Sequence, residues 1–301
     1  MLAVSVDLDE LDLYRAIHGL PSSGGAARVA YEVGVPRALG FAESLGVPLT
    51  FFAVGADLTH QACADVLTSA RRAGHEVASH SLTHPYNLVR LSAAEIRREV
   101  EGSFEVVERA VGARPAGFRA PGYTISDAVF DALEQAGARY DSSVFPCPLY
   151  YGAKLAVLGS MQALGRRSAS IVGPPQVLAA PAEPYRLARP YWKRGDRPLV
   201  ELPIQVTRGP RLPVIGTTLG RAGERGARAL VRACGDTPLL NLELHAIDFL
   251  DRADVPVELT GLPELRAPLT RRLSALRAAV GAALASGRRA VTLAAAAALA
   301  S

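Results

Sequence analysis

The sequence predicts a single α/β domain, folded as a (β/α) barrel of about seven or eight units. Short apolar runs alternate with longer helix-like segments along most of the chain, which is typical of a parallel sheet covered by helices. The length of 301 residues suits one such barrel. Polar residues follow several of the apolar runs, at the strand ends where barrel enzymes carry their chemistry.

In the first half of the chain, apolar runs predict the strands, and the segments between them predict helices. Residues 92–95 read Ser-Ala-Ala-Glu, a capping box that begins a long amphipathic helix. The stretch 10–34 is rich in Gly and Ser at its centre, and we expect a long loop there. The expected strands are 2–6, 48–54, 76–79, 117–119 and 138–142, and the expected helices are 36–44, 59–73, 92–111 and 126–135.

The segment 146–198 interrupts this rhythm. It is rich in Pro and Gly and contains the single tryptophan, Trp192. We therefore expect an insertion after the fifth strand, inside one domain that spans 1–301. Beyond it we expect strands at 199–206, 239–244 and 290–293, and helices at 223–233 and 264–285.

Composition argues against several classes of protein. The net charge of +4 comes from dispersed arginines, and no nucleic-acid motif is seen, so we expect no nucleic-acid partner. Three widely spaced cysteines indicate neither a disulfide framework nor a Cys-rich zinc site. The first residues do not resemble a signal peptide, and no apolar run is long enough to span a membrane. We expect a cytoplasmic protein.

The pair His80 and His84 is the main candidate for a metal site. Residues four apart lie on one face of a helical turn, so two imidazoles there can reach one metal ion. Asp9, just after the first strand, adds a carboxylate and leaves positions on the metal open, as a catalytic site needs. Zinc is the default metal, and cobalt, nickel, iron or manganese would also suit these ligands.

Further polar residues follow other strands and supply an acid and a base. Asp7 shares a strand face with Asp9 and is placed to accept a proton from water. Arg119 could pair with Asp7 and hold it ionised, while His245 ends a buried strand and could protonate a leaving amine. An acid and a base on either side of a metal-activated water is the machinery for hydrolysing an amide.

The order and form of these motifs resemble the polysaccharide deacetylase family, also called the NodB-homology group or carbohydrate esterase family 4. The first motif, Asp-Leu-Asp followed by Glu10, is similar to a branch with a spaced Asp-x-Asp. That branch includes intracellular peptidoglycan-deacetylase-like enzymes and lipid-linked aminosugar deformylases. The matching stretches are residues 5–9, 80–84, 119–123, 140–143 and 242–245.

The resemblance implies a distorted (β/α) barrel of the NodB-homology type. It also implies removal of an N-acyl group, acetyl or formyl, from an amino sugar or glycan precursor. By position in the motifs, Asp7 would be the base and the backbone N–H of Gly122 would donate to the oxyanion. His245 would be the acid, oriented by Asp141. The family usually has a tryptophan after that aspartate, whereas Ser142 stands here. The remaining roles are Asp9, His80 and His84 as metal ligands, Arg119 as the partner of Asp7, Asp248 as a substitute for Asp141, and Tyr123 as a ring that could stack on the sugar.

The apolar segment 150–167 with basic ends allows two interpretations. It could lie on a membrane surface or hold a lipid-linked sugar phosphate, or it could be a helix packed over the barrel mouth. The sequence does not determine the oligomeric state.

Other functions also remain open at this point. They are a non-catalytic glycan-binding protein that keeps the fold and a hydrolase of a non-sugar amide. A third is a non-haem iron oxygenase, which also uses two histidines and a carboxylate, but its usual His-x-Asp pattern is not seen here.

Overall fold

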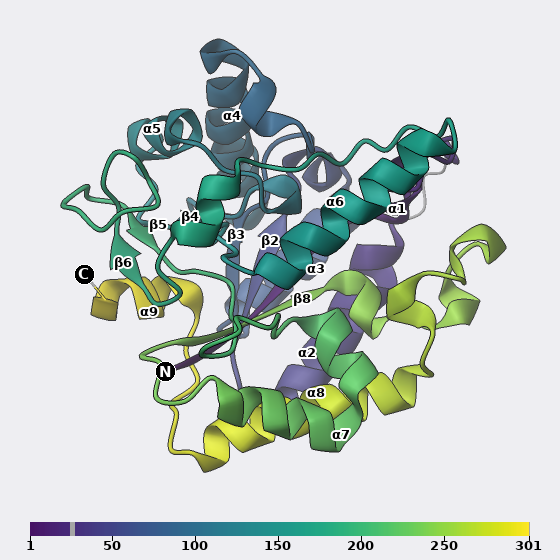
Figure 1. Ribbon diagram of the computed structural model, residues 1–301. Coiled ribbons are helices and arrows are strands. Elements are labelled where there is room, and N and C mark those ends of the chain that lie inside the picture. Colours follow the sequence, from purple (N-terminus) through teal and green to yellow (C-terminus); the bar gives the residue numbers. More distant parts are fainter. Residues whose placement is uncertain (25–27, 301) are drawn as a thin grey trace.

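The computed structural model describes residues 1–24 and 28–300 of the chain (Figure 1). Within these residues one eight-stranded sheet runs in the order β6-β7-β5-β4-β3-β2-β1-β8. Neighbouring strands are parallel, except that β6 pairs antiparallel with β7. The strands are β1 (Leu2–Asp7), β2 (Leu49–Ala53), β3 (Glu76–Ser79), β4 (Gly117–Phe118), β5 (Tyr140–Asp141), β6 (Tyr185–Arg186), β7 (Val200–Glu201) and β8 (Leu240–His245).

The sheet curls into an incomplete barrel, and the chain after β7 crosses the gap to β8. The backbone N–H of Gln205 donates to the Asn241 carbonyl at 3.2 Å. The Asn241 side-chain amide donates to the Leu202 carbonyl at 3.0 Å. These bonds hold the two sides of the barrel together where no regular ladder forms. The distorted (β/α) barrel predicted from the sequence is confirmed.

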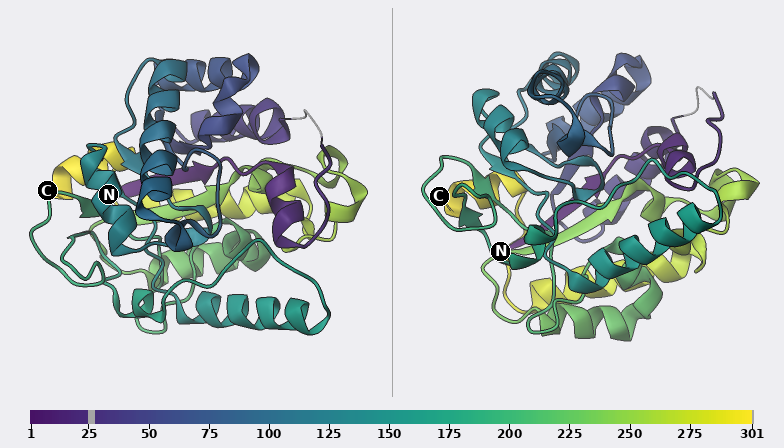
Figure 2. Two further views of the ribbon diagram at one scale, coloured as in Figure 1. Left: turned by 90° about the horizontal axis from the view of Figure 1, so that it is seen from above. Right: turned by 45° about the horizontal axis from the view of Figure 1, so that its top comes forward.

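Helices cover the outside of the barrel. In Figure 1, α7 and α8 pack side by side at the bottom, and α4 and α5 lie together at the top. The two further views in Figure 2 show the strands between these helical layers. The helices are α1 (Leu11–Ile17), α2 (Val35–Glu43), α3 (Gln61–Arg72), α4 (Ala93–Val111), α5 (Asp127–Gln135), α6 (Pro148–Ala163), α7 (Gly216–Ala233), α8 (Leu269–Ala285) and α9 (Leu293–Ala300).

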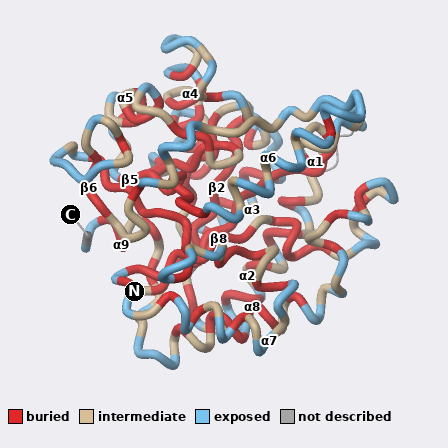
Figure 3. Tube along the Cα trace, viewed as in Figure 1, coloured by how far each residue is buried: buried red, intermediate tan, exposed pale blue. Residues whose placement is uncertain are grey.

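Alternation along β1 separates the apolar core from the site. Val4 and Val6 belong to the large cluster packed against the outer helices. Ser5 and Asp7 alternate with these valines and point the other way, so both share the interior face of the barrel. All of these residues are buried, and Figure 3 shows the central strands as the buried part of the trace. The pattern of β1 therefore delivers polar side chains into the barrel.

The alanine-rich C-terminus closes the end of the barrel opposite the site. The predicted strand 290–293 is wrong: Ala290 makes only an isolated bridge to Leu2, and α9 begins at Leu293. Alanine is the strongest helix former, and the Leu293 N–H donates to the Thr50 hydroxyl at 3.0 Å. Leu293 packs with Phe52 inside the barrel.

Other predicted elements also differ from the structure. The capping box of α4 is present, but stretch 10–34, predicted as a loop, contains α1 and a π-helical turn at Ala30–Gly34. Leu11 of α1 packs in the cluster of Ile247, and this burial stabilises the helix. Part of that prediction, 25–27, lies outside the described residues. The predicted strand 199–206 is regular only in β7, and Pro203 has no N–H to continue the ladder.

The insertion between β5 and β7 contains α6, a 3₁₀ turn at Pro175–Ala179, and β6. In Figure 1, α6 crosses the front of the molecule. This helix exposes apolar side chains to solvent, among them Leu155 and Val157. Among residues 1–24 and 28–300, no helix combines the length and hydropathy that crossing a membrane requires.

Candidate active site

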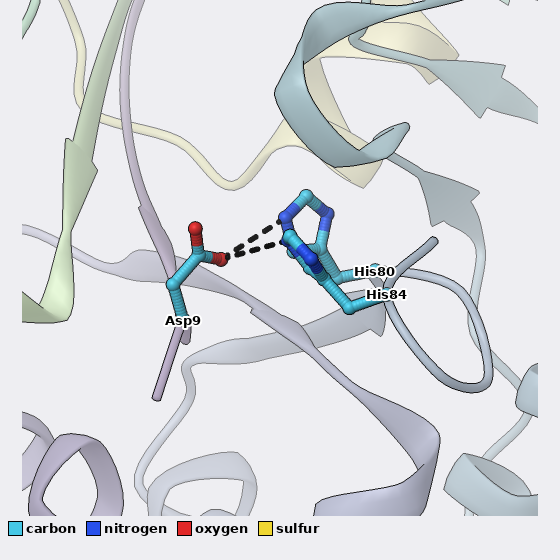
Figure 4. Close-up of side chains that lie close together, drawn as sticks. All are labelled: Asp9, His80 and His84. Carbon is cyan, nitrogen blue, oxygen red and sulfur yellow. Dashed lines mark ion pairs between the residues drawn. The ribbon is translucent and has the colours of Figure 1, made fainter. Parts of the chain in front are cut away.

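Asp9, His80 and His84 converge at the carboxyl end of the sheet, as Figure 4 shows. Asp9 Oδ1 lies 3.3 Å from Nε2 of both histidines, and all three residues are buried. Among the described residues, Asp9 Oδ1 and both ring nitrogens of His84 have no hydrogen-bond partner. Buried polar atoms without partners are costly, so this donor set fits a divalent cation of the zinc class.

The two histidines reach Asp9 by different routes. His80 follows β3, and its Nδ1–H donates to the Arg119 carbonyl at 2.7 Å. This bond fixes the tautomer and turns Nε2 toward Asp9. The expected helical turn between the histidines does not form: Ser81 and His84 have φ of +68° and +59°, so the chain reverses through left-handed conformations. The Ser81 hydroxyl accepts the His84 backbone N–H at 3.0 Å.

Asp7 lies beside this triad and is held by a fully buried Arg119. Arg119 Nη1 donates to Asp7 Oδ1 at 2.6 Å, and its other donors reach Ser5 and Ser142. Asp7 Oδ2 has no hydrogen-bond partner among the described residues. Burial raises the pKa of Asp7, and the charge of Arg119 opposes this rise. Asp7 is therefore a fixed carboxylate with one free oxygen and increased basicity.

The pKa of Asp9 changes in the opposite direction. Burial alone would raise this pKa, but the imidazoles of His84 and His80 more than compensate and hold it well below its usual range. Asp9 is thus ionised, as a metal ligand must be.

His245 approaches from β8, on the other side of the cavity from the histidine pair. Its Nδ1 lies 2.9 Å from Glu243 Oε1, and its Nε2 lies 3.9 Å from Asp9 Oδ2. Burial would lower the pKa of His245, but the buried Glu243 carboxylate raises it well above its usual value. The imidazolium form, which can donate a proton, is therefore favoured.

The structure corrects the predicted support of His245. Asp141 does not reach this imidazole: it accepts from the backbone N–H and hydroxyl of Ser143, at 2.9 and 2.8 Å. The Ser143 hydroxyl in turn accepts the Ala120 N–H at 2.8 Å, so Asp141 supports the loop that follows Arg119. Asp248 accepts the backbone N–H of His245 at 2.9 Å rather than its ring. Glu243 takes the predicted place of Asp141.

An open cavity of about 150 Å³ is lined by Asp7, Asp9, His80 and His245. Gly122 and Tyr123 line it, as predicted, and the Tyr123 hydroxyl lies 3.4 Å from His245 Nε2. Sequence reasoning missed Glu243, although it is two residues from His245 on the same strand face. It also missed the other cavity residues, whose positions depend on tertiary packing. These are Tyr14, Ile17, Tyr86, Tyr150, Lys154, Ser170, Ile215, Thr217 and Glu264.

The sequence is similar to known proteins over part of its length. The family model described as Polysaccharide deacetylase matches residues 29–140, a segment that holds His80, His84 and Arg119. A peptidoglycan deacetylase from Helicobacter pylori is 26% identical over 147 residues, which are 48% of this chain. The match spans about half the length of that relative, 49%.

Comparison with solved structures supports the fold. A protein from Mycobacterium smegmatis, provisionally assigned as a polysaccharide deacetylase, matches with a TM-score of 0.63 at 23% identity. The match covers 99% of this chain and 88% of that one. A peptidoglycan N-acetylglucosamine deacetylase matches with a TM-score of 0.50 at 14% identity, covering 97% and 85%. At these identities the likeness concerns the fold.

Proposed function

We propose that this chain, which belongs to the polysaccharide deacetylase family, is a metal-dependent hydrolase of N-acyl amino sugars. It would release acetate or formate and leave a free amine. The observation that carries the proposal is the convergence of three ligand groups, from Asp9, His80 and His84, between the carboxylate of Asp7 and the imidazole of His245. Zinc is the default metal, and cobalt, nickel, iron or manganese are compatible.

Asp9, His80 and His84 would hold the divalent cation, which when bound would supply Lewis-acid polarisation and a lowered pKa of water. Asp7 and His245 each carry out one of the two proton transfers. Asp7 Oδ2 accepts the proton of the attacking water, because Oδ1 is occupied by Arg119. His245 gives its Nε2 proton to the amide nitrogen as the carbon–nitrogen bond breaks. Glu243 stabilises the imidazolium before the transfer.

The oxyanion that develops on the acyl carbon needs donors fixed in advance. In this proposal the backbone N–H of Gly122 is one of them, because Gly122 lines the cavity together with Asp7 and His245. Its φ of +59° suits glycine. The family and the Helicobacter pylori relative support a carbohydrate or peptidoglycan substrate. A lipid-linked substrate, membrane contact and a cytoplasmic location stay predictions from the sequence.

Metal content is the first measurement. Elemental analysis would compare the wild type with His80→Ala, His84→Ala and the surface control His60→Ala. We expect near-stoichiometric metal in the wild type and the control, and loss in the two ligand variants. A wild type that holds no metal after reconstitution would overturn the metal-dependent hydrolase and favour a non-catalytic glycan-binding protein.

Turnover is the second measurement. Asp7→Asn should keep the metal but lose release of acetate or formate from N-acyl amino sugars by roughly a hundredfold or more. If Asp7→Asn keeps both its metal and its turnover, Asp7 is not the base. Release only from simple non-sugar amides would point to a different amidohydrolase.

A further inference from the structure

Lys154 is a partly buried cation of the insertion that lines the candidate active site. It lies on α6 and lines the same cavity as Asp7 and His245. Its Nζ donates to the Gly122 carbonyl at 3.0 Å and lies 5.9 Å from the centroid of the Tyr150 ring. Among the described residues, Lys154 forms no ion pair with a carboxylate. The mechanism proposed above does not use this side chain.

The missing counter-ion makes Lys154 unusual. Burial alone lowers the pKa of Lys154 to about 8, so the ammonium form still predominates at neutral pH. An ammonium has three donors, and one of them is used by Gly122. An opposite charge nearby stabilises the charged form of a group that is partly removed from water, and an anion bound in the cavity would provide that charge.

Three carboxylates of the site are already committed to other cations, and Glu264, which also lines the cavity, forms no ion pair with Lys154 among the described residues. Asp7 is paired with Arg119, Asp9 faces the histidine pair, and Glu243 contacts His245. The partner that Lys154 lacks must therefore come from outside the chain. A substrate that enters this cavity can supply it.

The position of Lys154 relates it to the reacting amide. Its hydrogen-bond partner, Gly122, is the residue whose N–H we assign to the oxyanion. Tyr123 and Tyr150 stand beside it with their ring centroids 5.7 Å apart. An anion on Lys154 would thus lie on the sugar that carries the N-acyl group, or next to it.

We propose that Lys154 selects acidic substrates, by pairing with a carboxylate or phosphate on the N-acylated amino sugar. This inference rests on the proposed function and narrows its substrate class. Because Lys154 belongs to the insertion, specificity would lie on α6, whereas the chemistry lies on the barrel strands.

The test uses three probes with one N-acetylated core. They are N-acetylglucosamine, which is neutral, N-acetylglucosamine 1-phosphate, and N-acetylmuramic acid, which carries a carboxylate. Acetate release would be measured with metal-reconstituted wild type, Lys154→Gln and Lys154→Met. The glutamine keeps a donor for the Gly122 carbonyl but removes the charge, and the methionine removes both. Lys193→Gln, at an exposed lysine of the same insertion, is the matched control.

The wild type should prefer at least one acidic probe, and the two acidic probes distinguish phosphate from carboxylate. Lys154→Gln should lower kcat/KM for the preferred acidic probe by roughly tenfold to a hundredfold, as expected for a hydrogen bond to a charged group. We expect less than about a threefold change for the neutral probe, and no change in Lys193→Gln. Equal losses on all three probes would overturn the inference and leave Lys154 only a role in holding the Gly122 loop.

Calorimetry separates this inference from the proposed function. Binding of the same probes to metal-loaded Asp7→Asn and to Asp7→Asn with Lys154→Gln requires no turnover. A charge preference that disappears with Lys154→Gln would support acidic-ligand selection even in a protein that hydrolyses none of the probes. If Asp7→Asn, which keeps Lys154, binds the neutral and acidic probes equally well, that selection is rejected, whether or not the protein is a deacetylase.

Discussion

The Nδ1 atom of His245 lies 2.9 Å from the carboxylate of Glu243, two residues earlier in the same strand. The strand partners of these residues in β1 are Asp7 for His245 and Ser5 for Glu243. One pair of neighbouring strands therefore places the proposed acid, the carboxylate beside it and the proposed base. Backbone pairing of β1 with β8 controls this arrangement.

Glu243→Gln should weaken the acid. The Glu243 carboxylate raises the pKa of His245, so its loss lets the imidazolium deprotonate at lower pH. The alkaline limb of the kcat/KM profile should move to lower pH, with activity at pH 8 reduced by about tenfold or more. Asp141→Asn is the control and should leave the position of that limb unchanged. A limb that moves in Asp141→Asn but stays in place in Glu243→Gln would restore Asp141 as the orienting group.

Arg119→Met should destabilise the protein strongly. It removes a fully buried guanidinium and leaves the Asp7 carboxylate without its partner. Breaking such a pair costs about 3–5 kcal/mol of unfolding free energy, which urea denaturation of the metal-free protein would measure. Arg228→Met breaks an exposed pair with Glu224 on α7 and should cost less than about 1 kcal/mol. Similar losses in both variants would contradict the buried pairing.

Gly117→Ala should disturb the strand that leads to Arg119. A Cβ at Gly117 would lie 2.1 Å from the ring of Tyr140, whose hydroxyl is bonded to Glu76. We expect a loss of about 1–3 kcal/mol or more from overpacking. Gly281→Ala, inside α8 and with open space around it, should instead stabilise by about 0.5–1 kcal/mol. Thermal unfolding would show whether Gly117→Ala lowers the stability and Gly281→Ala raises it.

Glu10 should make stability depend on pH. Burial, and then the nearby Asp57 carboxylate, raise the pKa of Glu10 to about 7. The folded state therefore holds this proton more tightly than the unfolded state, whose pKa is near 4.5. Stability should fall as the pH rises from about 4.5 to about 7, by up to about 3 kcal/mol, and then level off.

Urea unfolding from pH 5 to 8 in the presence of EDTA would test this dependence. Glu10→Gln keeps an acceptor for the Ala30 N–H and should make the fall shallower, above all between pH 6 and 7, because Asp57 and Asp248, whose pKa values are raised to about 6, remain. The surface variant Glu105→Gln should retain the wild-type slope. An unchanged slope in Glu10→Gln would assign the effect to other buried acids.

The residues that the sequence pattern can locate are those at strand ends. Parallel strands bring their carboxyl ends to one edge, so the positions of Asp7, His80 and His245 after apolar runs are enough to group them. The metal triad is predictable for the same reason. The route between the histidines is not, because the left-handed turn at Ser81 gives no clear signal in its residue type.

The errors have identifiable physical causes. The place of Asp141 in a motif suggests that it orients His245, whereas a period of two along β8 points to Glu243. The Gly/Ser-rich surroundings of α1 hide this helix, because contacts with residues such as Ile247 stabilise it. The placement of the Lys154 side chain in the cavity depends on how the insertion packs on the barrel, and no local sequence pattern predicts that packing.

The pairing of the first strand with the eighth means that the site cannot work in fragments. A chain still emerging from the ribosome already contains the histidine pair once β3 has been made, yet its proton donor is synthesised much later. Hydrolysis should therefore begin only after His245 has docked opposite Asp7. The proposed activity would therefore report that β1 and β8 have paired, and incomplete translation products would lack it.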